Sequence, residues 1–183
     1  MSNKTMKQFV EDGKPDSAIF AISLEDFFAW AMLTSDGEVC SYSSADMSFS
    51  SFQSFASQII QLKKELHAIP KLVEEVDGIV LRLPKLKDKN SEMAVRRLIC
   101  VGVIKAFFGM HDIPVLPVEE SDIPKEAVKE AQKIGSGVSN GAAGQEELYA
   151  LEALIAKTTP PEDENEEELE LHGQIKLRKA GAA

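Results

Sequence analysis

Apolar residues in the first part of the chain come in runs rather than at helical spacing. Residues 18–24 and 27–33 are almost entirely apolar, and a further mixed run follows at 38–43. The pair Asp36-Gly37 between the last two runs is typical of a tight hairpin turn. The pattern therefore predicts three consecutive antiparallel strands.

The pattern changes to helical spacing at residues 51–67, where apolar positions recur every three and four residues until Pro70. A short β-branched run at 77–83 then predicts a strand in the interior of a sheet. The elements expected after it are a helix at 91–110 that is buried on most sides, a strand at 113–118, a helix from Ser121 or Asp122 and a helix at 145–157. The acidic segment at 162–170 is expected to form a last helix, and a solvated or disordered tail is the alternative.

The predicted order is β-β-β-α-β-α-β-α-α-α, which is an α/β order. It favours a five-stranded mixed sheet, made of a three-strand antiparallel meander plus two parallel strands, with helices on both faces. A chain of 183 residues is long enough for one domain with its own core. We divide it into a flexible N-terminal lead at 1–16, a domain at 17–177 and a disordered end at 178–183.

Composition limits the possible functions. The chain is 44% hydrophobic and 27% charged, has no apolar run of membrane-spanning length and begins without a signal core, so we expect a cytoplasmic protein. Cys40 and Cys100 lie in apolar segments and are expected to be reduced, buried thiols. The net charge of −10 disfavours non-specific nucleic-acid binding, so any such binding needs a local basic patch.

Several segments share the order and spacing of one known family. Trp30 lies eight residues after Ile22, and the strand at 77–84 runs from Asp77 through aliphatic residues to Arg82. Residues 120–127 and 165–169 match two later segments of that family, in the same order along the chain. Together they resemble the RuvC-type Holliday-junction resolvases of the RNase H-like superfamily, over nearly the whole chain after residue 17.

The resemblance implies an RNase H-like fold and an activity of Mg²⁺-dependent endodeoxyribonuclease. In that family, Asp, Glu and Asp stand at the positions matched by Ile22, Arg82 and Glu168. The last belongs to a helix-start motif, Asn-or-His-x-x-Asp-Ala. Two-metal hydrolysis needs carboxylates that hold two ions about 4 Å apart, whereas a guanidinium repels Mg²⁺. We therefore expect these degenerate positions to be non-catalytic, with Glu168 paired to Arg82 and with no metal or cofactor.

Cations gather in the sequence around the end of the predicted strand at 77–83. The candidate residues for binding nucleic acid or another anion are Arg82, Lys85, Lys87, Lys89, Arg96, Arg97 and Lys125. The simpler interpretation of Arg82 is a strand-end arginine that pairs with a neighbouring acid and is otherwise solvated, and the basic loop after it is more often only a solvated surface. Our first hypothesis is a catalytically inactive RuvC-like protein, a homodimer from a bacterial or phage cytoplasm. It would bind branched or duplex DNA, or a protein partner.

Two alternatives stay open. An active, Mg²⁺-dependent, structure-specific endonuclease would need a displaced acidic site, for which Glu25 and Asp26 are candidates beside Glu168. The simpler interpretation of Glu25 and Asp26 is a polar hairpin turn. The second alternative is a protein-binding assembly factor whose negative surface avoids DNA.

Overall fold

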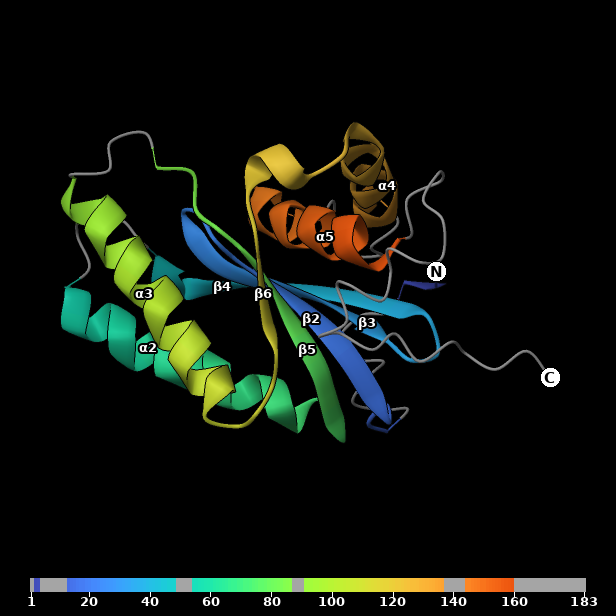
Figure 1. The fold of residues 1–183 in the computed structure, drawn as a ribbon, viewed down its shortest axis with the longest axis horizontal. Coiled ribbons are helices and arrows are strands. Elements are labelled where there is room, and N and C mark those ends of the chain that lie inside the picture. The colour runs from blue at the N-terminus through green and yellow to red at the C-terminus, as the bar shows by residue number, and fades with distance from the viewer. Residues whose placement is uncertain (1, 4–12, 49–53, 87–90, 137–143, 160–183) are drawn as a thin grey trace.

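A six-stranded mixed sheet forms the centre of the molecule (Figure 1), with strand order β1-β4-β3-β2-β5-β6. The computed structural model describes residues 2–3, 13–48, 54–86, 91–136 and 144–159. The strands are β1 (Ser2–Asn3), β2 (Ser17–Leu24), β3 (Phe27–Thr34), β4 (Glu38–Ser48), β5 (Glu75–Arg82) and β6 (Val115–Val118). The predicted five-stranded arrangement is confirmed by β2 to β6, and β1 adds a sixth strand parallel to β4.

The sheet joins an antiparallel half to a parallel half. β2, β3 and β4 form the predicted meander, and β5 and β6 pair in parallel beside β2. Gly37 has φ +80° in the β3–β4 turn, a backbone conformation that glycine adopts without strain. β4 runs five residues past the predicted end at Ser43. A register shift opposite Phe27 and Phe28 lets it continue, and the fully buried Met47 anchors its far end.

Helices cover both faces of the sheet (Figure 1). α2 (Phe55–Ala68) and α3 (Glu92–Gly109) lie on one face, and α4 (Lys125–Ser136) and α5 (Gln145–Thr158) lie on the other. Short 3-10 turns follow α2 and β6, at Ile69–Lys71 and Glu120–Asp122.

α4 begins later than predicted. The sequence pattern placed its start at Ser121 or Asp122, but Glu119 and Asp122 cap a separate 3-10 turn there. Ile123 is extended, with φ −92° and ψ 112°, because the ring of Pro124 disfavours helical geometry in the residue before it. The helix therefore cannot extend back through Ile123, and it starts at Lys125.

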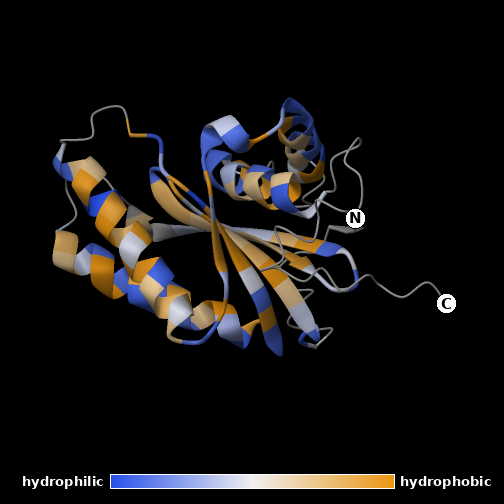
Figure 2. Ribbon diagram, viewed as in Figure 1, coloured by the Kyte–Doolittle hydropathy of each residue, from blue (hydrophilic) through white to orange (hydrophobic). Residues whose placement is uncertain are grey.

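The two faces of the sheet carry different cores. The face under α2 and α3 is built from large side chains, among them Phe20, Phe28, Trp30, Leu62 and Phe108. The face under α5 is built from smaller strand residues such as Ala21, Ala31 and Val80, which let α5 pack closely on β2, β3 and β5. Figure 2 shows the central strands as mostly hydrophobic, in line with burial on both faces.

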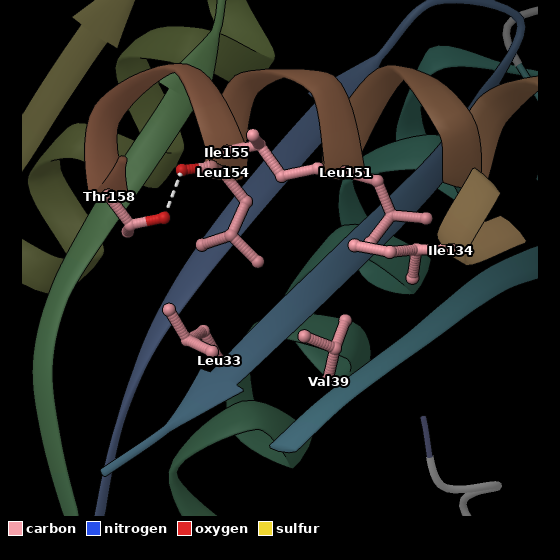
Figure 3. Close-up of a pocket in the computed structure, with 7 residues that line it drawn as sticks. All are labelled: Leu33, Val39, Ile134, Leu151, Leu154, Ile155 and Thr158. Atoms are coloured by element: carbon pink, nitrogen blue, oxygen red, sulfur yellow. Dashed lines mark hydrogen bonds between the residues drawn. The ribbon is translucent and has the colours of Figure 1, made fainter. Parts of the chain in front are cut away.

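α4 and α5 pack tightly against the ends of β3 and β4 that lie beside the turn between these strands. Leu33 and Val39 point from the strands towards side chains of α4 and α5, as Figure 3 shows. The gap between them leaves no room for a water molecule, and the Thr158 hydroxyl donates to the Leu154 carbonyl at 2.8 Å. This region is core, and it offers no ligand site.

The prediction that the 91–110 helix is buried on most sides is wrong. On α3, Val95, Leu98 and Ile99 are exposed by 45%, 47% and 44%, and Met110 beyond its end by 75%. Only one side of α3 packs on the sheet and α2, and no described element covers the other side. In the part of the chain that the structure describes, no helix is long and apolar enough to span a membrane.

Candidate functional site

Arg82, at the end of β5, is buried and paired. Its side chain is 4% exposed, and Nη1 donates to Glu152 Oε2 at 2.5 Å and to the Tyr149 carbonyl at 3.2 Å. The guanidinium also lies 4.2 Å from the centroid of the Tyr149 ring, at cation–π distance. Arg82 therefore has an acidic partner, as the simpler interpretation held, but its side chain is buried and not solvated, because α5 covers it. That partner is Glu152 of α5, and the predicted partner Glu168 lies outside the described residues.

The structure does not bring Ile22 and Arg82 together. Ile22 is in register with Leu81, and both side chains belong to the core under α2 and α3. Arg82 points to the opposite face, towards α5. Because side chains alternate along a strand, Ser23 is the β2 residue that shares the face of Arg82. Ser23 is fully buried, and its hydroxyl has no hydrogen-bond partner among the described residues.

A cleft of about 540 Å³ opens beside Arg82, a volume within the range of small-ligand sites. It lies where the β2–β3 turn, the end of β5, the start of α3 and the start of α5 meet. We call it the strand-end cleft. Its lining residues are Glu25, Asp26, Arg82, Lys85, Leu86, Ser91, Met93, Ala94, Arg97, Glu120, Gln145, Glu146 and Tyr149.

Two other cations of the cleft are paired with acids. Arg97 Nη2 donates to Asp26 Oδ1 at 3.0 Å, and Arg97 Nη1 lies 3.9 Å from Glu25 Oε2. Lys85 Nζ lies 2.8 Å from Glu120 Oε2. The hydrogen bond between them raises the pKa of Lys85 and lowers the pKa of Glu120.

The remaining predicted cations fall in three places. Arg96 is paired with Glu92 of the same helix and lies over the Phe55 ring, and it does not line the cleft. Lys125 is exposed at the start of α4. Lys87 and Lys89 lie outside the described residues. The structure thus brings Arg82, Lys85 and Arg97 to one cleft and places Arg96 and Lys125 apart from it.

Glu25 and Asp26, the candidates for a displaced metal site, hold the β2–β3 turn in place. Glu25 Oε1 accepts the backbone N–H of Lys85 at 2.9 Å, in addition to its contact with Arg97. The backbone N–H of Asp26 donates to Glu146 Oε1 at 3.2 Å. Across the described residues, no three His, Cys, Asp or Glu side chains group closely enough to hold a metal ion.

Glu146 is an acid that the sequence analysis missed. Burial raises its pKa, the charges of Asp26 and Glu25 raise it further, and backbone hydrogen bonds from the turn oppose the rise. Its Oε2 atom is buried and has no hydrogen-bond partner in the described part of the chain. Its neighbour Glu147 accepts hydrogen bonds from the hydroxyls of Ser41 and Ser43, both at 3.0 Å. Two consecutive glutamates thus fasten the start of α5 to the sheet.

The starts of two helices line the cleft. α3 begins after its N-cap Ser91, whose hydroxyl accepts the Ala94 N–H at 3.2 Å, and α5 begins at Gln145. Helix N-termini carry partial positive charge and favour anions nearby. The lining therefore combines three cations and two helix N-termini with four carboxylates, and the charges largely compensate one another.

The sequence of α5 also fits the helix-start motif that the sequence analysis placed at 165–169. Glu146-x-x-Tyr149-Ala150 has the motif's spacing, with Tyr149 at the Asp position. The contact of Tyr149 with Arg82 favours the placement at α5.

Comparison with known proteins supports the fold. No family model matches the chain, and no curated protein matches it. Among solved structures, the chain is similar to T. thermophilus RuvC in complex with a Holliday junction substrate, with a TM-score of 0.53 and 8% identity. The match covers 75% of this chain and 90% of that one. The chain therefore has an RNase H-like, RuvC-like fold, as predicted.

Proposed function

We propose that this chain is a RuvC-like protein that does not cleave nucleic acid and instead binds its phosphates in the strand-end cleft. The observation that carries the proposal is the buried pair of Arg82 and Glu152, packed on Tyr149. A divalent ion at the end of β5 would be repelled by the guanidinium of Arg82. The carboxylate of Glu152 nearby is already paired with that guanidinium. On β2, the residue that shares the face of Arg82 is Ser23, whose buried hydroxyl is not a carboxylate that could hold a divalent ion.

The binding part of the proposal rests on the cleft itself. Lys85 and Arg97 lie in its lining, together with the N-termini of α3 and α5, and these are groups that attract phosphate oxygens. The RuvC structure similar to this chain holds a Holliday junction, which makes branched DNA the first ligand to test. Because the net charge is −10, binding would depend on this local site.

The test measures cleavage and binding on the same four-way junction and on duplex DNA of matched sequence. We expect no cleavage with Mg²⁺ or Mn²⁺, and binding that weakens as salt rises because phosphate contacts release counterions. Lys85→Ala should weaken binding, whereas Lys129→Ala, an exposed cation on α4 outside the cleft, should not. Metal-dependent cleavage that is lost in Asp26→Asn would instead favour the displaced-site nuclease.

A second candidate function is protein binding, and the exposed apolar side of α3 favours it. Val95, Leu98 and Ile99 share that side with Gly102, beside which an added Cβ would meet nothing. Exposed apolar patches on a folded protein mark interaction sites, and the predicted homodimer would use this one. Sedimentation of the wild type and of Leu98→Glu tests it: association lost in the variant supports the candidate, and a monomeric wild type rejects the homodimer. Gln132→Glu, an exposed change on α4, is the matched control.

A further inference from the structure

We propose that Asp26 and Glu120 act as built-in competitors for the strand-end cleft, because they hold the cations that an incoming phosphate would contact. The inference rests on the proposed function and adds how the affinity of that site is set. Each acid makes one ion pair across the cleft lining, Asp26 with Arg97 and Glu120 with Lys85. A bound phosphate would have to replace these carboxylates.

The three acids that contact Arg97 or Lys85 differ in exposure, and the difference identifies the competitors. The side chains of Asp26 and Glu120 are 78% and 52% exposed, so they can turn into solvent when an anion arrives. Glu25 is only 15% exposed and also accepts the Lys85 backbone N–H, so it stays in place as part of the turn. Asp26 and Glu120 are therefore the displaceable pair, and Glu25 is the fixed one.

Arg97 and Lys85 are positioned to bind a phosphate oxygen in place of a carboxylate. The Arg97 side chain is 11% exposed, so its guanidinium is held against the turn and keeps its direction when Asp26 leaves. Lys85 is 62% exposed on the other side of the cleft and can follow a ligand. A carboxylate and a phosphate oxygen offer the same kind of acceptor to these groups, which makes the competition direct.

The expected size of the effect is modest. Exposed ion pairs are weak, so an internal carboxylate lowers phosphate affinity by about twofold to fivefold for each pair that must be broken. Removing both acids should raise the affinity by roughly tenfold. Each cation released to contact phosphate should also steepen the dependence of log affinity on log salt by about 0.7 to 0.9.

The experiment compares Asp26→Asn, Glu120→Gln and the double variant with Glu126→Gln, using fluorescence anisotropy of the four-way junction and the duplex at several salt concentrations. Glu126 is exposed on α4 outside the cleft, so its substitution changes the net charge by the same amount as each cleft variant. The expected result is tighter, more salt-dependent binding in the cleft variants and little change in Glu126→Gln. An equal gain in Glu126→Gln, or no gain in the cleft variants, overturns the inference.

A second measurement separates competition from a change in total charge. If Glu120 acts through Lys85, then Glu120→Gln should raise affinity in the wild type and have no effect in Lys85→Ala. The same gain in both backgrounds overturns the inference. Thermal unfolding of each variant checks that the fold is intact.

The failure of this inference and the failure of the proposed function look different. Wild-type binding that Lys85→Ala weakens, without any gain in Asp26→Asn or Glu120→Gln, leaves the proposed function in place and rejects the competitors. Absence of DNA binding in the wild type and in all variants rejects both. Binding that appears only when the two acids are removed supports the competitors.

Discussion

Two ion pairs of similar chemistry lie at the strand-end cleft and differ in burial. Arg82 and Glu152 are 4% and 9% exposed, whereas Lys85 and Glu120 are 62% and 52% exposed. Water screens the second pair, and either partner can leave it at little cost. The first pair is shielded from water, so removal of one partner leaves an isolated charge in the interior. Burial thus decides which cation is part of the structure and which remains available to a ligand.

The largest expected effect comes from breaking the buried pair. Arg82→Ala leaves Glu152 buried without its partner, and we expect a loss of about 3–5 kcal/mol in the free energy of unfolding. Chemical denaturation measures it. Glu152→Ala should cost a similar amount, because it strands the guanidinium instead.

The double variant Arg82→Met with Glu152→Leu sharpens the comparison. Apolar groups of similar volume need no partner, so stability should return to near the wild-type value. A double variant as unstable as Arg82→Ala would mean that the contacts of Arg82 with Tyr149 matter more than its charge.

The sequence indicated Arg82 but not its partner, and the reason lies in α5. Glu152 stands between Leu151 and Ala153 in an otherwise apolar stretch, and all three are buried. A single acid within such a stretch is the signal that could have pointed to it, since a buried charge requires a partner. The family resemblance pointed instead to Glu168 in the acid-rich segment at 165–169, because an acid there matches the family motif.

The sequence predicted the strands, but it did not predict which side chains of each strand face which layer of helices. The apolar runs of β2 and β5 and the Asp36-Gly37 turn were enough to place the meander and the parallel pair. A strand buried on both faces has no polar side to show which residues face which helix layer. The family resemblance placed Ile22 at the centre beside Arg82, and no polar pattern along β2 corrected it, although Ile22 lies on the opposite face of the sheet.

Ser23 gives the next effect in size. Its hydroxyl is fully buried on the face of Arg82, and no described group bonds to it. An unsatisfied buried hydroxyl is destabilising, so Ser23→Ala should raise the free energy of unfolding by about 1 kcal/mol. Denaturant titration of the variant checks it. A loss of stability would reveal a hydrogen bond to an ordered water at this position.

Glu146 should give a smaller effect that depends on pH. Its pKa is raised in the folded protein, so the stability it contributes is present at low pH and is lost as pH rises through that value. Glutamine resembles the protonated acid and still accepts the Asp26 N–H. Glu146→Gln should therefore match the wild type in acid and exceed it at neutral pH, as thermal unfolding across pH 3–8 can show. A difference of the opposite sign would mean that the ionised carboxylate has a cationic partner.

The exposed pair should give the smallest effect on stability, and that result completes the comparison with Arg82 and Glu152. Lys85→Ala and Glu120→Gln remove a contact that solvent already screens, so the melting temperature should stay within error of the wild type. The small difference in melting temperature between each variant and the wild type should not grow as the salt concentration is raised. A clear drop in melting temperature in either variant would show that the pair fastens the end of β5 to the segment after β6. Glu120 would then be a structural residue, and it would not be free to give way to a phosphate.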